Sequence, residues 1–166
     1  PPAASPAFLK FLSAEAKELN SRNVDVAGAE ERMRTLVASL NPADIRYAAE
    51  LVTGMKGPAN ERIMAAYSVS QALATLAAGP ALDAAREAAE KIVTQPFHSD
   101  RAAPHSADEV MNAQAKSFAL MNVDALAERA AKDQPSREAL ERMGKAAKDP
   151  LVQKYIQEKL RRLPPL

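Results

Sequence analysis

Both histidines of the chain lie in one segment, residues 95–105, together with two prolines and an aspartate. Histidine nitrogens and carboxylate oxygens are common zinc ligands. The candidate ligands in this segment and just after it are His98, Asp100, His105, Asp108 and Glu109. Their spacing matches no familiar zinc motif, and the chain has no cysteine that could complete one. We therefore expect no metal and no other cofactor, and a metal-dependent enzyme that uses the 95–105 loop is the least favoured function.

Ser99 and Ser106 lie close to the same histidines, which raises the question of a nucleophilic arrangement of serine, histidine and aspartate. A serine of this kind needs a sharp turn between a strand and a helix, as in the G-x-S-x-G pattern. The sequence has no such pattern and no alternating apolar run that would predict a strand. Paired carboxylates such as Glu30 and Glu31 are more typical of an acidic helix start than of a catalytic pair. We therefore expect no catalytic residue and a protein that is not an enzyme.

Arginine and tyrosine, which are enriched at binding hot spots, occur near the starts of two predicted helices. With the loop residues included, the candidates for partner binding are Arg46, Tyr47, Glu50, His98, Asp100, His105, Lys154 and Tyr155. The competing interpretation is structural. In that interpretation Arg46 pairs with Asp44 or with a neighbouring helix, and the tyrosines fill gaps in the core.

The composition is that of a globular protein, because 47% of the residues are hydrophobic and 26% are charged. The net charge of +1 is too small to predict binding to nucleic acid, which usually needs a clearly basic face. Without cysteine, the chain can form neither a disulfide nor a thiolate site. These observations favour another protein as the partner.

A run without charged residues separates Arg62 from Asp83. Its length is close to that of a membrane span, but Ser68, Ser70 and several alanines make it too polar for one. Small or apolar residues occupy most of its faces at helical spacing, which is typical of a buried helix. We therefore expect residues 61–79 to form the central helix of the fold, and we expect no membrane span.

The last predicted helix ends in a basic turn that contains Lys159, Arg161 and Arg162. Cations at the end of a helix complement its dipole, which explains the turn without any ligand. Contact of this turn with a membrane surface or with RNA is the alternative, and such binding would be strongly dependent on salt.

Prolines mark most of the helix starts, because proline suits the first helical turn, where its missing N–H needs no partner. The expected helices, about nine in number, span residues 6–20, 25–40, 42–56, 58–79, 80–94, 106–121, 122–132, 136–148 and 150–163. The turns between them are short and favour antiparallel helical hairpins. We expect residues 1–5 to form a disordered linker and residues 6–163 to form a single all-α domain.

Two helix junctions share a pattern, an Asn-Pro or Asp-Pro turn followed by a β-branched residue. Residues 41–46 (NPADIR), followed by Ala48 and Ala49, give the closer match, and residues 149–152 (DPLV) give the second, with Gln153 in the place of an arginine. This pattern resembles the turn of the HEAT-type helical repeat. The resemblance implies an α-solenoid of stacked hairpins with an extended face that binds proteins. A compact bundle of the same hairpins is the alternative architecture.

The leading hypothesis is a non-enzymatic interaction module or scaffold that binds a partner protein through the surface near Arg46, Tyr47 and the 95–105 loop. The alternative is a bacterial envelope protein, periplasmic or lipid-anchored, that acts as a helical chaperone or inhibitor of a secreted partner. It rests on residues 1–6 (PPAASP), which resemble the linker after a cleaved signal peptide or a lipid anchor, and on the lack of cysteine. These two features slightly favour an envelope location over the cytoplasm.

Overall fold

The computed structural model describes residues 3–97 and 105–166, apart from the side chain of Asp108. Within these residues the chain is all-α, as predicted, with eight helices and no strand. The helices are α1 (Pro6–Glu18), α2 (Val26–Val37), α3 (Pro42–Thr53), α4 (Ala59–Thr75), α5 (Pro80–Thr94), α6 (Ala107–Ala130), α7 (Gln134–Ala146) and α8 (Pro150–Arg162).

The two helices expected over residues 106–121 and 122–132 are one continuous helix, α6, of 24 residues. No proline or glycine interrupts it, and the buried residues Phe118 and Val123 continue its apolar stripe across the expected boundary. Asn122 does not cap a new helix. Its side-chain amide donates a hydrogen bond of 2.9 Å to the carbonyl of Phe118, one turn earlier in the same helix.

Helix starts follow the predicted chemistry. Proline occupies the first turn of α1, α3, α5, α7 and α8. Side chains complete the caps: Ser5 accepts from the N–H of Phe8, and Asn41 accepts from the N–H of Asp44. These bonds satisfy N–H groups that have no partner within the helix, so the helix starts are set by local residues.

The central helix ends earlier than predicted. α4 stops at Thr75, and Leu76 already has an extended backbone with φ −71° and ψ 141°. Residues 77–78 are exposed instead of buried. The residue before a proline disfavours the helical conformation, so the chain leaves the helix ahead of Pro80 and begins α5 there.

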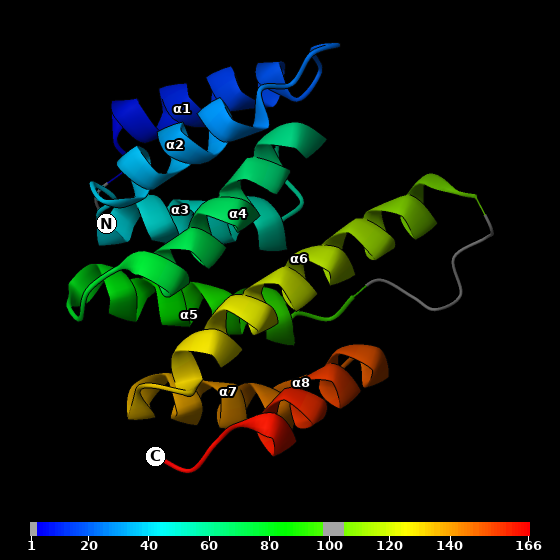
Figure 1. Ribbon diagram of the computed structural model, residues 1–166. Helices are drawn as coiled ribbons and strands as arrows, with labels where there is room; N and C mark the ends of the chain where they lie inside the picture. Colours follow the sequence, from blue (N-terminus) through cyan, green and yellow to red (C-terminus); the bar gives the residue numbers. More distant parts are fainter. Residues whose placement is uncertain (1–2, 98–104) are drawn as a thin grey trace.

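Successive helices run in opposite directions across the molecule (Figure 1). The odd-numbered helices run one way across the molecule, and the even-numbered helices run back. From α3 onward each helix packs on its chain neighbour, and helices two apart in the chain also pack together: α3 contacts α5, α5 contacts α7, α4 contacts α2 and α6, and α6 contacts α8. No described helix is long and apolar enough to cross a membrane, as expected for the uncharged run.

α4 is the central helix, as predicted, because it contacts α1, α2, α3, α5 and α6. Ala65, Ala66 and Ala72 on this helix are completely buried, and Val69 and Leu73 lie between them with no exposed area. Alanine leaves room for neighbouring backbones to approach closely. The small residues that make α4 weakly amphipathic are therefore what lets five helices pack around it.

The start of α8 is held by a buried cap. Asp149 accepts hydrogen bonds from the N–H groups of Leu151 at 2.9 Å and Val152 at 3.1 Å. Its other oxygen lies 2.8 Å from the ammonium of Lys116 on α6. Burial raises the pKa of Asp149, but the bonds from Lys116, Val152 and Leu151 outweigh burial, so the pKa lies below its usual value.

We predict that Ala66→Leu destabilises the fold by about 1–3 kcal/mol, because a completely buried methyl on α4 leaves no space for a larger side chain. The matched control is Ala74→Leu, the same change at an exposed position of the same helix. It should alter the free energy of unfolding by less than about 0.5 kcal/mol. Urea unfolding followed by circular dichroism measures both. Equal effects of the two changes would show that α4 is not closely packed.

Asp149→Ala removes the cap and the ion pair, so we expect it to cost about 1–2 kcal/mol at neutral pH. Asp149→Asn keeps a capping oxygen and should cost less. Because the folded pKa of Asp149 is lowered, its ionic contribution is present above the ordinary aspartate pKa and is lost as the pH falls through the folded value. Both variants should therefore approach the wild type in acid. Melting temperatures across the acid range test this, and variants that melt with the wild type at neutral pH would contradict it.

Candidate functional site

A groove with a cavity volume of about 400 Å³ lies between α6 and α8. Its lining residues are Asp124, Ala127, Glu128, Tyr155, Lys159, Arg162 and Leu163. Ala127 and Leu163 supply apolar surface, and the other side chains supply polar or charged groups. The groove therefore offers both an apolar contact and fixed polar partners to whatever occupies it.

Helical spacing explains how the two helices present these residues. Tyr155 and Lys159 are four residues apart on α8 and share a face. They flank Val152 and Ile156, which are completely buried and anchor α8 on the rest of the fold. On α6, Asp124 and its neighbours in the groove repeat the same spacing beside the buried stripe. Packing of the two apolar stripes therefore brings the polar flanks together.

Asp124 is the centre of the polar contacts in the groove. The Tyr155 hydroxyl donates to its Oδ1 at 2.5 Å, and the Lys159 ammonium lies 3.0 Å from the same oxygen. The Lys159 nitrogen also lies 5.3 Å from the centre of the Tyr155 ring, within the range of a cation–π contact. These contacts fix the tyrosine ring at the edge of the groove.

The same contacts shift two pKa values. The hydrogen bond to Asp124, with burial and the charge of Asp124, raises the pKa of Tyr155 above its ordinary value of 10.0. The hydrogen bond to Asp124 also raises the pKa of Lys159, against the opposing effect of burial. At neutral pH the tyrosine is therefore neutral and the lysine is charged. Both act as hydrogen-bond donors, and neither is poised to accept a proton.

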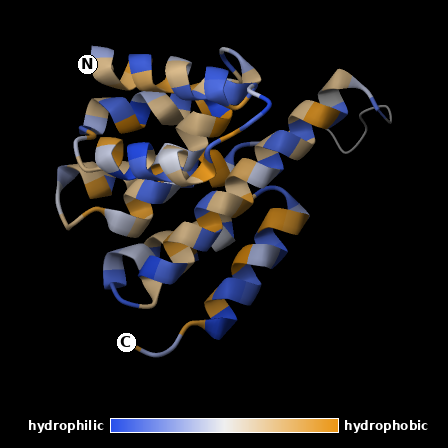
Figure 2. Cartoon of the chain, turned by 45° about the horizontal axis from the view of Figure 1, so that its top comes forward, coloured by the Kyte–Doolittle hydropathy of each residue, from blue (hydrophilic) through white to orange (hydrophobic). Residues whose placement is uncertain are grey.

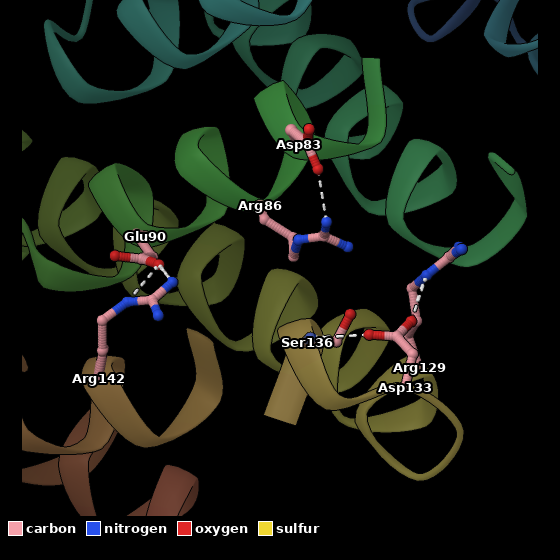
Figure 3. A network of polar contacts seen from close by, with 7 residues as sticks. All are labelled: Asp83, Arg86, Glu90, Arg129, Asp133, Ser136 and Arg142. Carbon is pink, nitrogen blue, oxygen red and sulfur yellow. Dashed lines mark hydrogen bonds and ion pairs between the residues drawn. The ribbon is translucent and has the colours of Figure 1, made fainter. Parts of the chain in front are cut away.

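A second polar cluster joins α5, α6 and α7 (Figure 3). Arg142 donates to Glu90 through Nε at 3.1 Å and through Nη2 at 2.5 Å. Arg129 donates to Asp133 at 2.9 Å, and it also donates to the carbonyl of Leu73 at 2.8 Å, near the end of α4. Each charge in these bonds has a partner within the chain, which indicates that they hold the helices together.

Asp133 in this cluster caps α7. It accepts a hydrogen bond of 2.7 Å from the N–H of Ser136. Burial raises the pKa of Asp133, but hydrogen bonding by Ser136 and Arg129 outweighs burial and leaves the pKa below its usual value. Arg86 pairs with Asp83 at 2.6 Å on α5 (Figure 3).

Arg46 does not pair with Asp44, which was one option of the structural interpretation. Asp44 is buried, and it accepts instead from the N–H of Ser5 at 2.7 Å and from the Ser5 hydroxyl at 3.1 Å, which holds the start of α1 on α3. Arg46 is exposed, and it lines a pocket of about 360 Å³ with Ala3 and residues 41–43. It forms no ion pair with any described residue.

The other predicted residues are spread over the molecule. Tyr47 is half-buried, and its ring meets that of Phe8 edge to face, with centroids 6.4 Å apart, as the core interpretation expects. Glu50 and Lys154 are exposed. His105 is exposed, and its backbone N–H donates a hydrogen bond to the carboxylate of Glu109.

His98 and Asp100 lie outside the described residues. Within residues 3–97 and 105–166, no group of three or more histidine and carboxylate side chains is placed to hold a metal ion. α3 and α5 run in the same direction side by side, so the start of α3 lies at the end of the fold opposite to the end of α5 (Figure 1). The start of α3 therefore lies far from Thr94, the last residue of α5.

Of the predicted residues, Tyr155 belongs to the groove, whereas its partner Asp124 was not predicted. The two residues are 31 positions apart, on helices whose contact has no local sequence signal. Tyr155 was predicted from its residue type near the start of a helix, and its spacing of four residues from Lys159 is a further signal in the sequence that the two share a face. No protein-family model, curated protein or solved structure matches the chain.

We predict that alkali destabilises the fold through the groove. Because Tyr155 and Lys159 have raised folded pKa values, their contribution to stability is present below the unfolded values and is lost as the pH rises through the folded values. Asp124→Asn should shrink this loss and lower the pKa of Tyr155. The ultraviolet absorbance of tyrosinate as a function of pH measures the pKa of Tyr155. Tyr155→Phe identifies which part of the signal comes from Tyr155, because the chain has three tyrosines. A titration curve unchanged by Asp124→Asn would contradict the assigned contact.

Proposed function

We propose that this chain is a non-enzymatic interaction module that binds another protein through the groove between α6 and α8. The observation that carries the proposal is the lining of the groove. It combines Tyr155, Arg162 and Leu163 at the surface of the last hairpin. An aromatic ring and an arginine beside an apolar side chain are the combination found at the centres of protein interfaces.

The fixed position of Tyr155 supports binding. A side chain that is free in solution loses rotamer entropy when a partner orders it, at about 0.5–1.5 kcal/mol. The hydrogen bond to Asp124 and the contact with Lys159 hold the ring before any partner arrives. A partner that packs on this ring therefore avoids most of that entropy loss.

The packing of helices supports an α-solenoid-like array of the HEAT kind. In such arrays each helical hairpin stacks on the next, and the helices of alternate number form separate layers. The contacts of α3 with α5 and of α4 with α6 follow this pattern, as do those of α5 with α7 and of α6 with α8. In this architecture the last hairpin has one neighbour only, and its groove stays open to a partner.

Affinity capture from the extract of the native cell, with the tagged full chain as bait, tests the proposal. We expect Arg162→Ala to reduce the amount of retained protein several-fold, because loss of a hot-spot arginine costs more than about 1 kcal/mol. Arg46→Ala is the matched control, the same change at an exposed arginine near the start of α3. It should leave retention unchanged.

Two results would contradict the proposal. The first is no protein retained above the level of the tag alone. The second is retention that depends on Arg46 and not on Arg162, which would move the binding surface to α3. Circular dichroism of each variant confirms that both are folded before the comparison is made.

A further inference from the structure

We infer that the protein segment bound by the α6–α8 groove is acidic, an inference that rests on the proposed function. The charges of the chain are unevenly distributed. Residues 132–166 contain nine lysines and arginines against five aspartates and glutamates, whereas residues 1–131 contain thirteen against sixteen. Residues 132–166, which include the hairpin of α7 and α8, therefore have a net charge of +4, although the net charge of the whole chain is only +1.

Several cations of the hairpin form no ion pair with a carboxylate of the described residues. The exposed cations of the hairpin that pair with no described carboxylate are Lys132, Lys145, Lys148, Lys154 and Arg162. Arg142 and Lys159, by contrast, are held by Glu90 and Asp124. The unpaired cations lie at both ends of the hairpin, with Lys145 and Lys148 near the turn between α7 and α8, and Arg162 among them lines the groove.

The lining of the groove is balanced in charge, with Asp124 and Glu128 against Lys159 and Arg162, so the positive excess of the hairpin lies around the groove and not inside it. Asp124 is already matched by Lys159 and by the hydroxyl of Tyr155. Arg162 has no such partner among the described residues. A second cavity, of about 460 Å³, adjoins the groove because both are lined by Glu128, and this cavity is lined by Lys132. Lys132 therefore lines the second cavity and Arg162 lines the groove, and Glu128 belongs to both linings.

An acidic protein segment fits this surface better than a nucleic acid does. Proteins that bind single-stranded nucleic acid stack bases on exposed aromatic rings. Tyr155 is the one aromatic residue of residues 132–166, so this part of the chain offers no row of rings on which successive bases could stack.

A membrane surface fits the hairpin less well for a different reason. A helix that lies on a membrane needs one broad apolar face. The outward surface of α8 is mostly hydrophilic, with hydrophobic residues near its start (Figure 2). Leu151 is the large apolar side chain that α8 exposes most, at the end of the helix away from the groove. The concave, part-apolar groove instead accepts an apolar side chain of a peptide whose carboxylates meet the surrounding cations.

Asp124 then has a second role, as a carboxylate of the chain itself that competes for the donors of the groove. A bound carboxylate is repelled by Asp124 and shares Lys159 and Tyr155 with it. Asp124→Asn removes the negative charge and keeps an oxygen that accepts the tyrosine hydrogen bond. It should therefore strengthen the binding of an acidic segment, by about twofold to fivefold.

The test uses the full chain and a fluorescein-labelled peptide of repeated Glu-Glu-Leu, with a Lys-Lys-Leu peptide of equal length as the charge control. Fluorescence anisotropy should show binding of the acidic peptide alone, and added salt should weaken it. Lys132→Gln and Arg162→Gln should each weaken binding about threefold to tenfold. Lys10→Gln, at an exposed lysine of α1, is the matched control and should have no effect. If Asp124→Asn does not fold, the lysine and arginine variants decide the question.

Several outcomes would overturn the inference: no binding of the acidic peptide, equal binding of the two peptides, or equal binding by Lys132→Gln, Arg162→Gln and the control. Tighter binding to phosphatidylglycerol vesicles or to a homopolymer RNA than to the acidic peptide would also overturn it. The two proposals fail separately. If the native extract yields a partner whose retention depends on Arg162 while the acidic peptide does not bind, the proposed function stands and the inference that the bound segment is acidic is wrong.

Discussion

The close packing of other helices around the small side chains of α4 is the constraint on which the rest of the structure depends. α4 contacts five other helices, and its inward positions are filled by alanines that have no exposed area. Larger side chains there would push α3, α5 and α6 apart. α6 runs beside α4 from Gln114, which accepts from Arg62, to Arg129, which donates to the carbonyl of Leu73, and it also packs on α7 and α8. The groove between α6 and α8 is thus positioned by packing that occurs elsewhere.

The sequence predicted the parts of the fold that are decided locally. Helix starts were predictable because a proline and a capping side chain, such as Ser5 or Asp149, act within one turn. The continuity of α6 was not, because asparagine suits both a helix cap and a helix interior, and the burial of Asn122 by other helices decides between them. In the groove, Tyr155 was predictable from its type, whereas Asp124 depends on a contact between distant segments.

The cations of the chain fall into two groups, those paired with a carboxylate of the chain and those that are not. The cations of α5 and α6 near the middle of the fold, such as Arg86 and Arg129, are matched by carboxylates one turn away. On α7 and α8 several exposed cations form no ion pair with a carboxylate in the described part of the chain, and they remain available for an external charge. The structure thus separates cations that hold helices together from cations that face solvent. The second group, beside the aromatic and apolar lining of the groove, is what links this fold to a binding function.

Amide hydrogen exchange of the full chain, resolved by residue, tests the central claim most directly. If α4 is the packed centre of the fold, the amides of residues 65–73 exchange only when the whole protein unfolds. They should then be the slowest in the chain, and their opening free energy should equal the global stability measured with urea. Exchange of these amides as fast as that of the outer turns of α1 or α8 would contradict the account.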